Sequence, residues 1–117
     1  MSKHLDNTKQ WAADAMYMPG VWITDVRTGD EDVTYTWYDE DEDHIESRIM
    51  TYPELQAAIE HLAAGTYTDH TGTEQPLNAY NVAACVNILN NYDEADYDAN
   101  TDDIIAQQAV LGKQIYG

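Results

Sequence analysis

The chain has 117 residues and a formal net charge of −17, because 22 Asp and Glu residues are opposed by only 5 Lys and Arg. This charge repels nucleic acids and anionic membranes, which argues against direct binding to either. A hydrophobic fraction of 44 %, with 9 tyrosines and 3 tryptophans, excludes a disordered acidic tail and predicts one folded domain over residues 1–117.

An amphipathic helix is predicted near the N-terminus. Residues 5–18 place apolar side chains at helical spacing. Asp6 or Asn7 is the candidate N-cap. Pro19-Gly20 is expected to end the helix, because both residues favour turns over helical backbone.

A small antiparallel sheet is predicted next. Residues 21–26 and 33–38 are rich in β-branched and aromatic residues, and the polar loop between them contains a glycine, which is typical of a hairpin. Residues 44–50 are interpreted as a third strand. The alternation in the second strand predicts one face with Val33, Tyr35 and Trp37, and an opposite face with Thr34, Thr36 and Tyr38.

The clearest local signal is a helix start at Thr51. Thr51 can cap the helix, Glu54 stands three residues later as its capping-box partner, and Pro53 is tolerated in the first turn. Leu55, Ala58, Ile59 and Leu62 follow at helical spacing on one face. Gly65 is placed to end the helix.

The rest of the chain predicts two more helices. Residues 66–76 form a polar loop with a brief strand at its start, and residues 78–91 are an apolar core helix. Residues 93–101 are an acidic loop, after which Thr101 or Asp102 caps a last helix. The predicted fold is therefore α+β: an N-terminal helix, a small antiparallel three-stranded sheet, then three helices packed on one face.

The acidic residues gather in three clusters that hold 15 of the 22 acids. A compact domain is destabilised by such self-repulsion, so the clusters indicate a surface that binds something basic. The clusters are Asp30, Glu31 and Asp32; Asp39, Glu40, Asp41, Glu42 and Asp43 with Glu46; and Asp93, Glu94, Asp96, Asp98, Asp102 and Asp103.

The charge is comparable to that of duplex DNA. DNA carries one negative charge per ~1.7 Å of axis, so a length of roughly 35 Å bears about 20 charges. If the second cluster is extended, Asp39, Asp41 and Asp43 line one side at a spacing of ~6.6 Å, similar to successive phosphates. Carboxylates are also good bidentate partners for phosphate-binding arginines.

In charge pattern, the chain resembles the small acidic DNA-mimic proteins with which phages and mobile elements block restriction enzymes or CRISPR complexes. The resemblance implies a non-enzymatic inhibitor that occupies the basic nucleic-acid groove of a partner protein. It also implies that carboxylates stand in for phosphates, and that the protein acts in the cytoplasm of a host cell. Tyr38 and Tyr97, which lie beside or within the clusters, are the candidate aromatic interface residues.

Two alternatives stay open. Asp96, Asp98, Asn100 and Asp102 supply alternating oxygens, as at the start of a calcium loop, so a small calcium-binding or acidic adaptor module using residues 93–103 is the alternative function. However, such a loop needs glycine where Thr101 stands. The other alternative is a solvated acidic surface suited to high salt.

No catalytic motif or cofactor site is predicted. Cys85 lies in an apolar helix, so we expect a buried free thiol in a reducing, cytoplasmic compartment. We expect no signal leader, and no apolar run reaches the ~18 residues that a membrane-spanning helix requires. His44, beside the second cluster, is expected to have a raised pKa. A homodimer that lengthens the acidic surface is left open.

Overall fold

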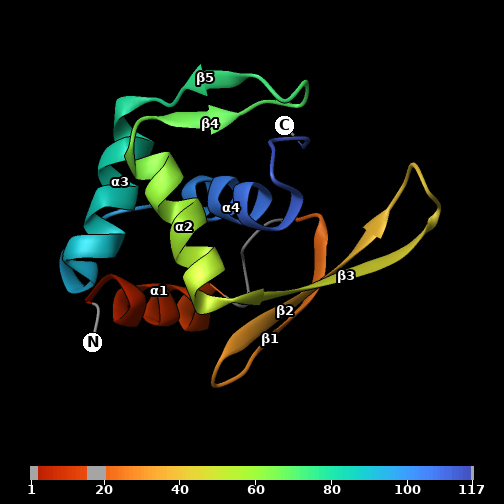
Figure 1. Ribbon diagram of the computed structural model, residues 1–117, viewed down its shortest axis with the longest axis horizontal. Coiled ribbons are helices and arrows are strands. Elements are labelled where there is room, and N and C mark those ends of the chain that lie inside the picture. Colours follow the sequence, from red (N-terminus) through yellow and green to blue (C-terminus); the bar gives the residue numbers. More distant parts are fainter. Residues whose placement is uncertain (1–2, 16–20, 117) are drawn as a thin grey trace.

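The computed structural model describes residues 3–15 and 21–116. A three-stranded antiparallel sheet lies beside a group of helices, which confirms the predicted α+β fold (Figure 1). In chain order the elements are α1 (Lys3–Asp14), β1 (Ile23–Thr28), β2 (Asp32–Asp39), β3 (His44–Thr51), α2 (Tyr52–Ala63), β4 (Thr66–Thr68), β5 (Glu74–Pro76), α3 (Ala79–Asn90), a 3₁₀ turn (Tyr92–Glu94), α4 (Ala99–Ala106) and a π-helical segment (Gln107–Leu111).

The sheet has the order β1-β2-β3, with both neighbouring pairs antiparallel. The predicted alternation on β2 is confirmed, because Val33, Tyr35 and Trp37 are buried against the helices. The opposite face of the sheet is open to solvent and carries Ile45 and Ile49 of β3, which are 70 % and 62 % exposed.

Helix α2 begins at the predicted capping box. The Thr51 hydroxyl oxygen accepts a hydrogen bond from the backbone N–H of Glu54 at 3.3 Å, and the Glu54 carboxylate accepts one from the backbone N–H of Thr51 at 2.9 Å. Gly65 follows the helix with φ of 109°, a conformation that favours glycine. Leu55 and Ile59 are fully buried, so this helix anchors the core.

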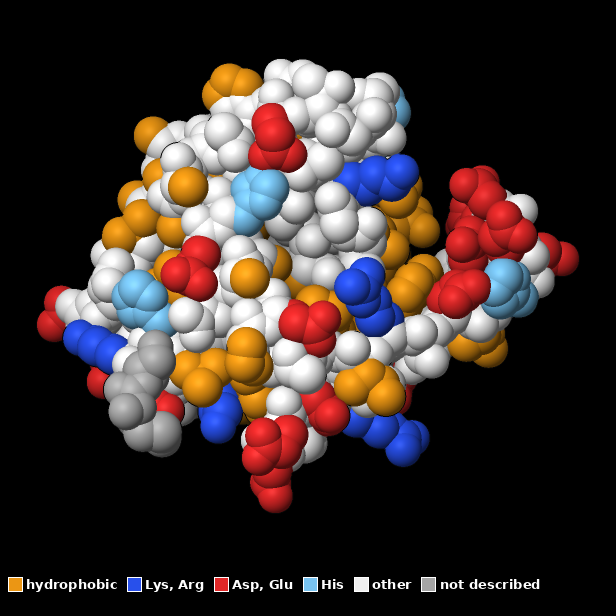
Figure 2. Space-filling model, in the orientation of Figure 1, with side chains coloured by type: hydrophobic (Ala, Val, Ile, Leu, Met, Phe, Trp, Pro, Cys, Tyr) orange, Lys and Arg blue, Asp and Glu red, His pale blue; other side chains and the backbone are white. Residues whose placement is uncertain are grey.

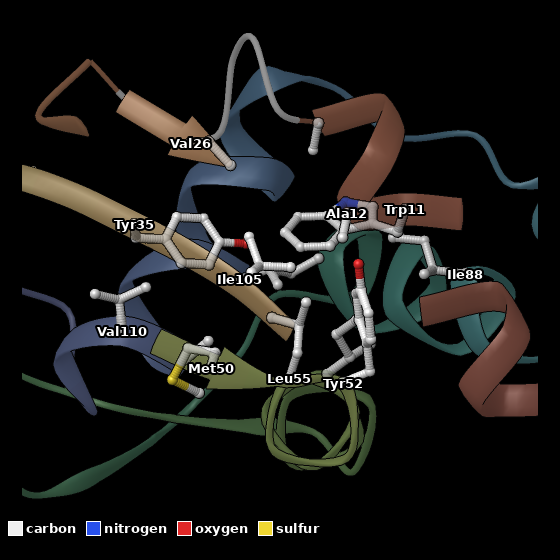
Figure 3. Close-up of a cluster of buried hydrophobic side chains, with 14 of the residues drawn as sticks. Trp11, Ala12, Val26, Tyr35, Met50, Tyr52, Leu55, Ile88, Ile105 and Val110 are labelled. Carbon is white, nitrogen blue, oxygen red and sulfur yellow. The ribbon is translucent and has the colours of Figure 1, made fainter. Parts of the chain in front are cut away.

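One hydrophobic cluster joins the sheet to the helices. Trp11 from α1, Tyr35 from β2, Leu55 from α2, Ile88 from α3 and Ile105 from α4 point toward one another in its centre (Figure 3). Each is at most 2 % exposed. Because five elements contribute, the core fixes the sheet relative to all four helices. Among the described residues, no helix has both the length and the apolar character needed to cross a bilayer.

Two predicted element starts near the N-terminus are wrong. Helix α1 begins at Lys3, so Asp6 and Asn7 lie inside it, and Asn7 Nδ2 instead donates to the carbonyl of Leu89 at 2.6 Å. The predicted continuation through residue 18 and the end at Pro19-Gly20 lie outside the described residues. The first strand begins at Ile23, two residues later than predicted.

The last helix begins earlier than predicted. Asp98 is its N-cap, with Oδ1 accepting from the backbone N–H of Thr101 at 3.0 Å. Thr101 and Asp102 are therefore inside α4, where both are buried. The predicted brief strand at residues 66–68 is confirmed as β4, and it pairs with a second strand, β5, that the sequence did not predict.

Candidate functional site

The fold separates the first two acidic clusters. Asp30–Asp32 lie at the β1–β2 turn and Asp39–Asp43 at the β2–β3 turn, at opposite ends of β2. Since β2 has 8 residues, the two clusters are about 23 Å apart along the strand. They therefore do not form one continuous row.

The ends of strands β2 and β3 beside the β2–β3 turn project beyond the helical body as an arm (Figure 1). Its end, residues Asp39–Asp43, is called the hairpin tip below. Figure 2 shows acidic side chains gathered there, at a distance from the body. The side chains of residues 40–43 are exposed and that of Asp39 is half-buried. The carboxylates of residues 40–43 are therefore accessible from solvent.

The expected straight row of Asp39, Asp41 and Asp43 is wrong, because residues 40–43 form a turn. Asp39 Oδ1 accepts hydrogen bonds from the backbone N–H groups of Asp41 at 3.0 Å and Glu42 at 3.2 Å. Asp43 has φ of 53°, in the left-handed region that aspartate tolerates better than most residues. Asp39 and Asp43 therefore build the turn, while Glu40, Asp41 and Glu42 are presented outward.

Two further contacts hold the hairpin tip. The Tyr38 hydroxyl donates to Asp43 Oδ1, and this bond is the largest cause of the raised pKa of Tyr38. The raised pKa of His44 is confirmed, but its largest cause is the hydrogen bond to the Glu42 carbonyl, followed by the bond to Glu46. The charge of Asp39 makes a smaller contribution to the raised pKa of His44. A protonated His44 donates from both ring nitrogens and so closes the turn.

Aromatic side chains fix the base of the arm. Trp22 packs edge-on against Trp37, with ring centroids 6.0 Å apart, and stacks on Tyr116 at 5.4 Å. The pKa of Tyr116 is raised, first by burial and then by the charges of Asp39 and Glu40. The C-terminal segment and the hairpin tip therefore lie close enough to interact electrostatically.

The β1–β2 turn is held by α2. Tyr52, the first residue of α2, donates from its hydroxyl to the carbonyl of Gly29 at 2.6 Å. Its pKa is raised, mainly by burial and then by the charges of Asp32 and Asp30. Asp30 and Glu31 are exposed and Asp32 is half-buried. This turn is a second, smaller acidic surface.

The third cluster is divided between surface and interior. Asp93, Glu94 and Asp96 are exposed. Asp102 is buried, and its Oδ1 accepts from the indole N–H of Trp11 at 2.8 Å. Asp103 is half-buried and accepts from the indole N–H of Trp22 at 2.7 Å. Asp98 caps α4. Half of the third acidic cluster, namely Asp98, Asp102 and Asp103, therefore makes hydrogen bonds within the fold.

Burial raises the pKa of Asp102 to about 6, while the hydrogen bond from Trp11 opposes the rise.

Tyr97 is half-buried and its hydroxyl lies 2.7 Å from that of Tyr92, which in turn donates to Asp14 Oδ2 at 2.6 Å. Tyr97 is thus part of a packing contact, whereas Tyr38 is 42 % exposed beside the hairpin tip. The sequence does not predict a role for Asp14, because only the fold brings its carboxylate to the Tyr92 hydroxyl.

The candidate calcium ligands are not arranged around one point. Asp98 Oδ1 caps α4 and Asp102 Oδ1 accepts from Trp11, so both carboxylates already have protein donors. Among residues 3–15 and 21–116, no group of three or more His, Cys, Asp or Glu side chains is placed to hold a metal ion.

Little basic charge opposes the exposed acids. Within the part of the chain that the structure describes, Arg27 and Asp25 form an ion pair at 3.1 Å, and the remaining pairs, His44–Glu46 and His61–Glu74, involve histidine. Lys9 lies over the ring of Tyr52, and Arg48 donates to the carbonyl of Val110. The carboxylates of the hairpin tip therefore have no Lys or Arg partner among the described residues.

Comparisons with known proteins found no matching family model, no matching curated protein and no matching solved structure.

Proposed function

We propose that the protein is a non-enzymatic nucleic-acid mimic that binds and blocks the basic DNA- or RNA-binding groove of a partner protein. The carrying observation is the hairpin tip, an exposed group of carboxylates at the end of a projecting arm, without Lys or Arg partners among the described residues. Restriction enzymes and CRISPR effectors are the partner class that the charge pattern suggests, and the host cytoplasm is the proposed place of action.

The size and charge of the domain support this proposal. Its longest extent is 40 Å, a length of duplex DNA that carries about 24 charges. The formal net charge of −17 is of the same order. The main contact with the partner's basic groove is made by Glu40, Asp41 and Glu42. The exposed acids at the β1–β2 turn form a second contact about 23 Å away.

Binding of this kind is governed by long-range attraction. Opposite charges on two partners accelerate diffusional encounter, and added salt screens that attraction. We therefore expect rapid association with the partner that slows steeply as ionic strength rises. Tyr38 contributes a partly exposed aromatic ring beside the carboxylates.

Affinity capture followed by competition tests the proposal. Immobilised protein is exposed to host lysate and eluted with a salt gradient, and each basic nucleic-acid-binding protein recovered is then bound to fluorescent DNA or RNA. We expect excess protein to displace the nucleic acid at low salt. Partners that keep their nucleic acid in the presence of excess bound protein would overturn the proposal.

The calcium-binding or adaptor alternative has less support, because Asp98 and Asp102 use their carboxylates within the fold. Calorimetry with calcium and with an Asp96→Ala, Asp98→Ala variant separates the two functions. A surface adapted only to high salt predicts a different result, namely that the domain unfolds when salt is lowered.

A further inference from the structure

Strand β3 is an edge strand with two exposed isoleucines. It pairs with β2 along one side, and 6 of its 8 residues are exposed. Ile45 and Ile49 project from the open face of the sheet. Long exposed edges with apolar side chains favour pairing with another strand, so natural sheets usually protect them.

The opposite edge of the sheet is protected in the usual way. Strand β1 contains a register shift between Ile23 and Asp25, and such bulges interrupt pairing with a further strand. Its exposed positions include the charged pair Arg27 and Asp25. The two edges therefore differ, and β3 is the one suited to pairing.

The sequence of β3 is complementary to itself when two copies run antiparallel. With Ser47 opposite Ser47 of a second copy, Ile45 faces Ile49 and Glu46 faces Arg48. Each contact occurs twice because the arrangement is two-fold symmetric. Apolar and opposite-charge pairs at facing positions both stabilise antiparallel strands.

We propose that the protein forms a two-fold symmetric homodimer through β3, giving a six-stranded sheet in which Glu46 of each copy pairs with Arg48 of the other. The pairing satisfies the backbone groups along the free edge of β3. It also brings Ile45 of each copy against Ile49 of the other, and both side chains are exposed in the single chain.

An open groove beside β3 leaves room for side chains of the second β3. The groove measures about 380 Å³ and is lined by Arg48 and Met50 of β3, by α2 residues including His61, and by the π-helical segment. Figure 2 shows basic side chains beside the notch between body and arm. In the proposed register, Glu46 of the second copy enters beside Arg48, so its negative charge meets one of the few basic side chains.

The dimer joins acidic clusters that the single chain keeps apart. Asp43 of one copy faces Thr51 of the other, and Thr51 is the neighbour of Asp32 within its own sheet. Each hairpin tip thus comes near the β1–β2 turn of the second copy. The longer acidic surface matters for inhibition only if the proposed function is correct, whereas the pairing itself does not depend on it.

The effect of salt separates the two proposals. Two copies each carrying −17 repel one another, so self-association strengthens as salt screens that repulsion. Binding to a basic groove weakens under the same change. A failure of one proposal therefore does not imply failure of the other.

Charge-swap complementation tests the pairing. Sedimentation equilibrium at micromolar to sub-millimolar protein in about 0.5 M NaCl, where the Debye length is near 4 Å, measures self-association. The variants E46R and R48E each place like charges in contact. We expect each to weaken the dimer at least about tenfold alone, and an equimolar mixture to regain it, because the arginine introduced by E46R then faces the glutamate introduced by R48E. The control variants D25R and R27E make the same charge changes on β1 and leave the dimer intact.

Hydrogen exchange locates the interface, and thermal unfolding checks that each variant is folded. Amides of β3 should gain protection with concentration in the wild type and in the mixture, while thermal unfolding shows that each variant is folded alone. A wild-type chain that stays monomeric overturns the proposal. So do variants that still dimerise, a mixture that fails to regain the dimer, or a loss of dimer in the β1 controls.

Discussion

Replacing Asp102 with asparagine should stabilise the protein near neutral pH. Asp102 is buried, and its carboxylate accepts a hydrogen bond from Trp11 Nε1. Asparagine has nearly the same shape and can accept that bond through its amide oxygen. The substitution therefore removes a buried charge without removing the contact that holds α4 against α1.

The size of the effect follows from the pKa. Burial raises the pKa of Asp102 from 3.8 to about 6, so the folded state holds a proton that the unfolded state releases. Stability is consequently lost as pH rises from the unfolded pKa through the folded pKa. By linkage the loss stays below about 1 kcal/mol at pH 4 and reaches roughly 3 kcal/mol above pH 7. Asp102→Asn should recover that loss at neutral pH.

Urea unfolding followed by tryptophan fluorescence measures this difference. The free energy of unfolding of the Asp102→Asn variant and of the wild type is compared at pH 4 and pH 7.5 in constant salt. Asp103→Asn is the matched control, because Asp103 also accepts from an indole N–H but is half-buried. An Asp102→Asn variant that is not stabilised at pH 7.5, or equally stabilised at both pH values, would refute the reasoning.

Two other predictions concern single contacts. Thr51→Ala breaks the capping box and should lower the free energy of unfolding by about 1 kcal/mol with an unchanged urea slope; an unchanged urea midpoint would contradict the role of the cap. Cys85 is fully buried, and burial raises its pKa to about 12, so a thiol-specific reagent should modify it only when the protein unfolds. Rapid labelling of the native protein would show that the thiol is accessible.

Predictions from sequence succeeded where the signal was local. The start of α2 depends on Thr51 and Glu54, which are three residues apart and bond to each other. The hairpin and third strand follow from alternation within short runs. These features are set by neighbours in the chain, so distant contacts are not needed to predict them.

The acidic clusters required the fold. From sequence, Asp102 is predicted to lie on the binding surface as a member of the third acidic cluster, but its carboxylate is buried against Trp11, 91 positions away. The prediction of a straight row of Asp39, Asp41 and Asp43 is wrong for a different reason. A run between two antiparallel strands must reverse direction, so the predicted hairpin already excluded an extended segment there.

Charge reversal at the hairpin tip tests the central claim most directly. Glu40, Asp41 and Glu42 are changed to lysine, while Asp39 and Asp43 are kept because they build the turn. The measurement is displacement of labelled nucleic acid from the captured partner. A control with the same net charge reverses three exposed acids away from the tip: Asp6, Asp25 and Glu60.

If the hairpin tip enters the basic groove, its reversal should weaken displacement by about 100-fold, and the control should weaken it less than about tenfold. Equal losses in both variants would mean that overall charge, and not the hairpin tip, is responsible. Full displacement by the tip variant would contradict the account.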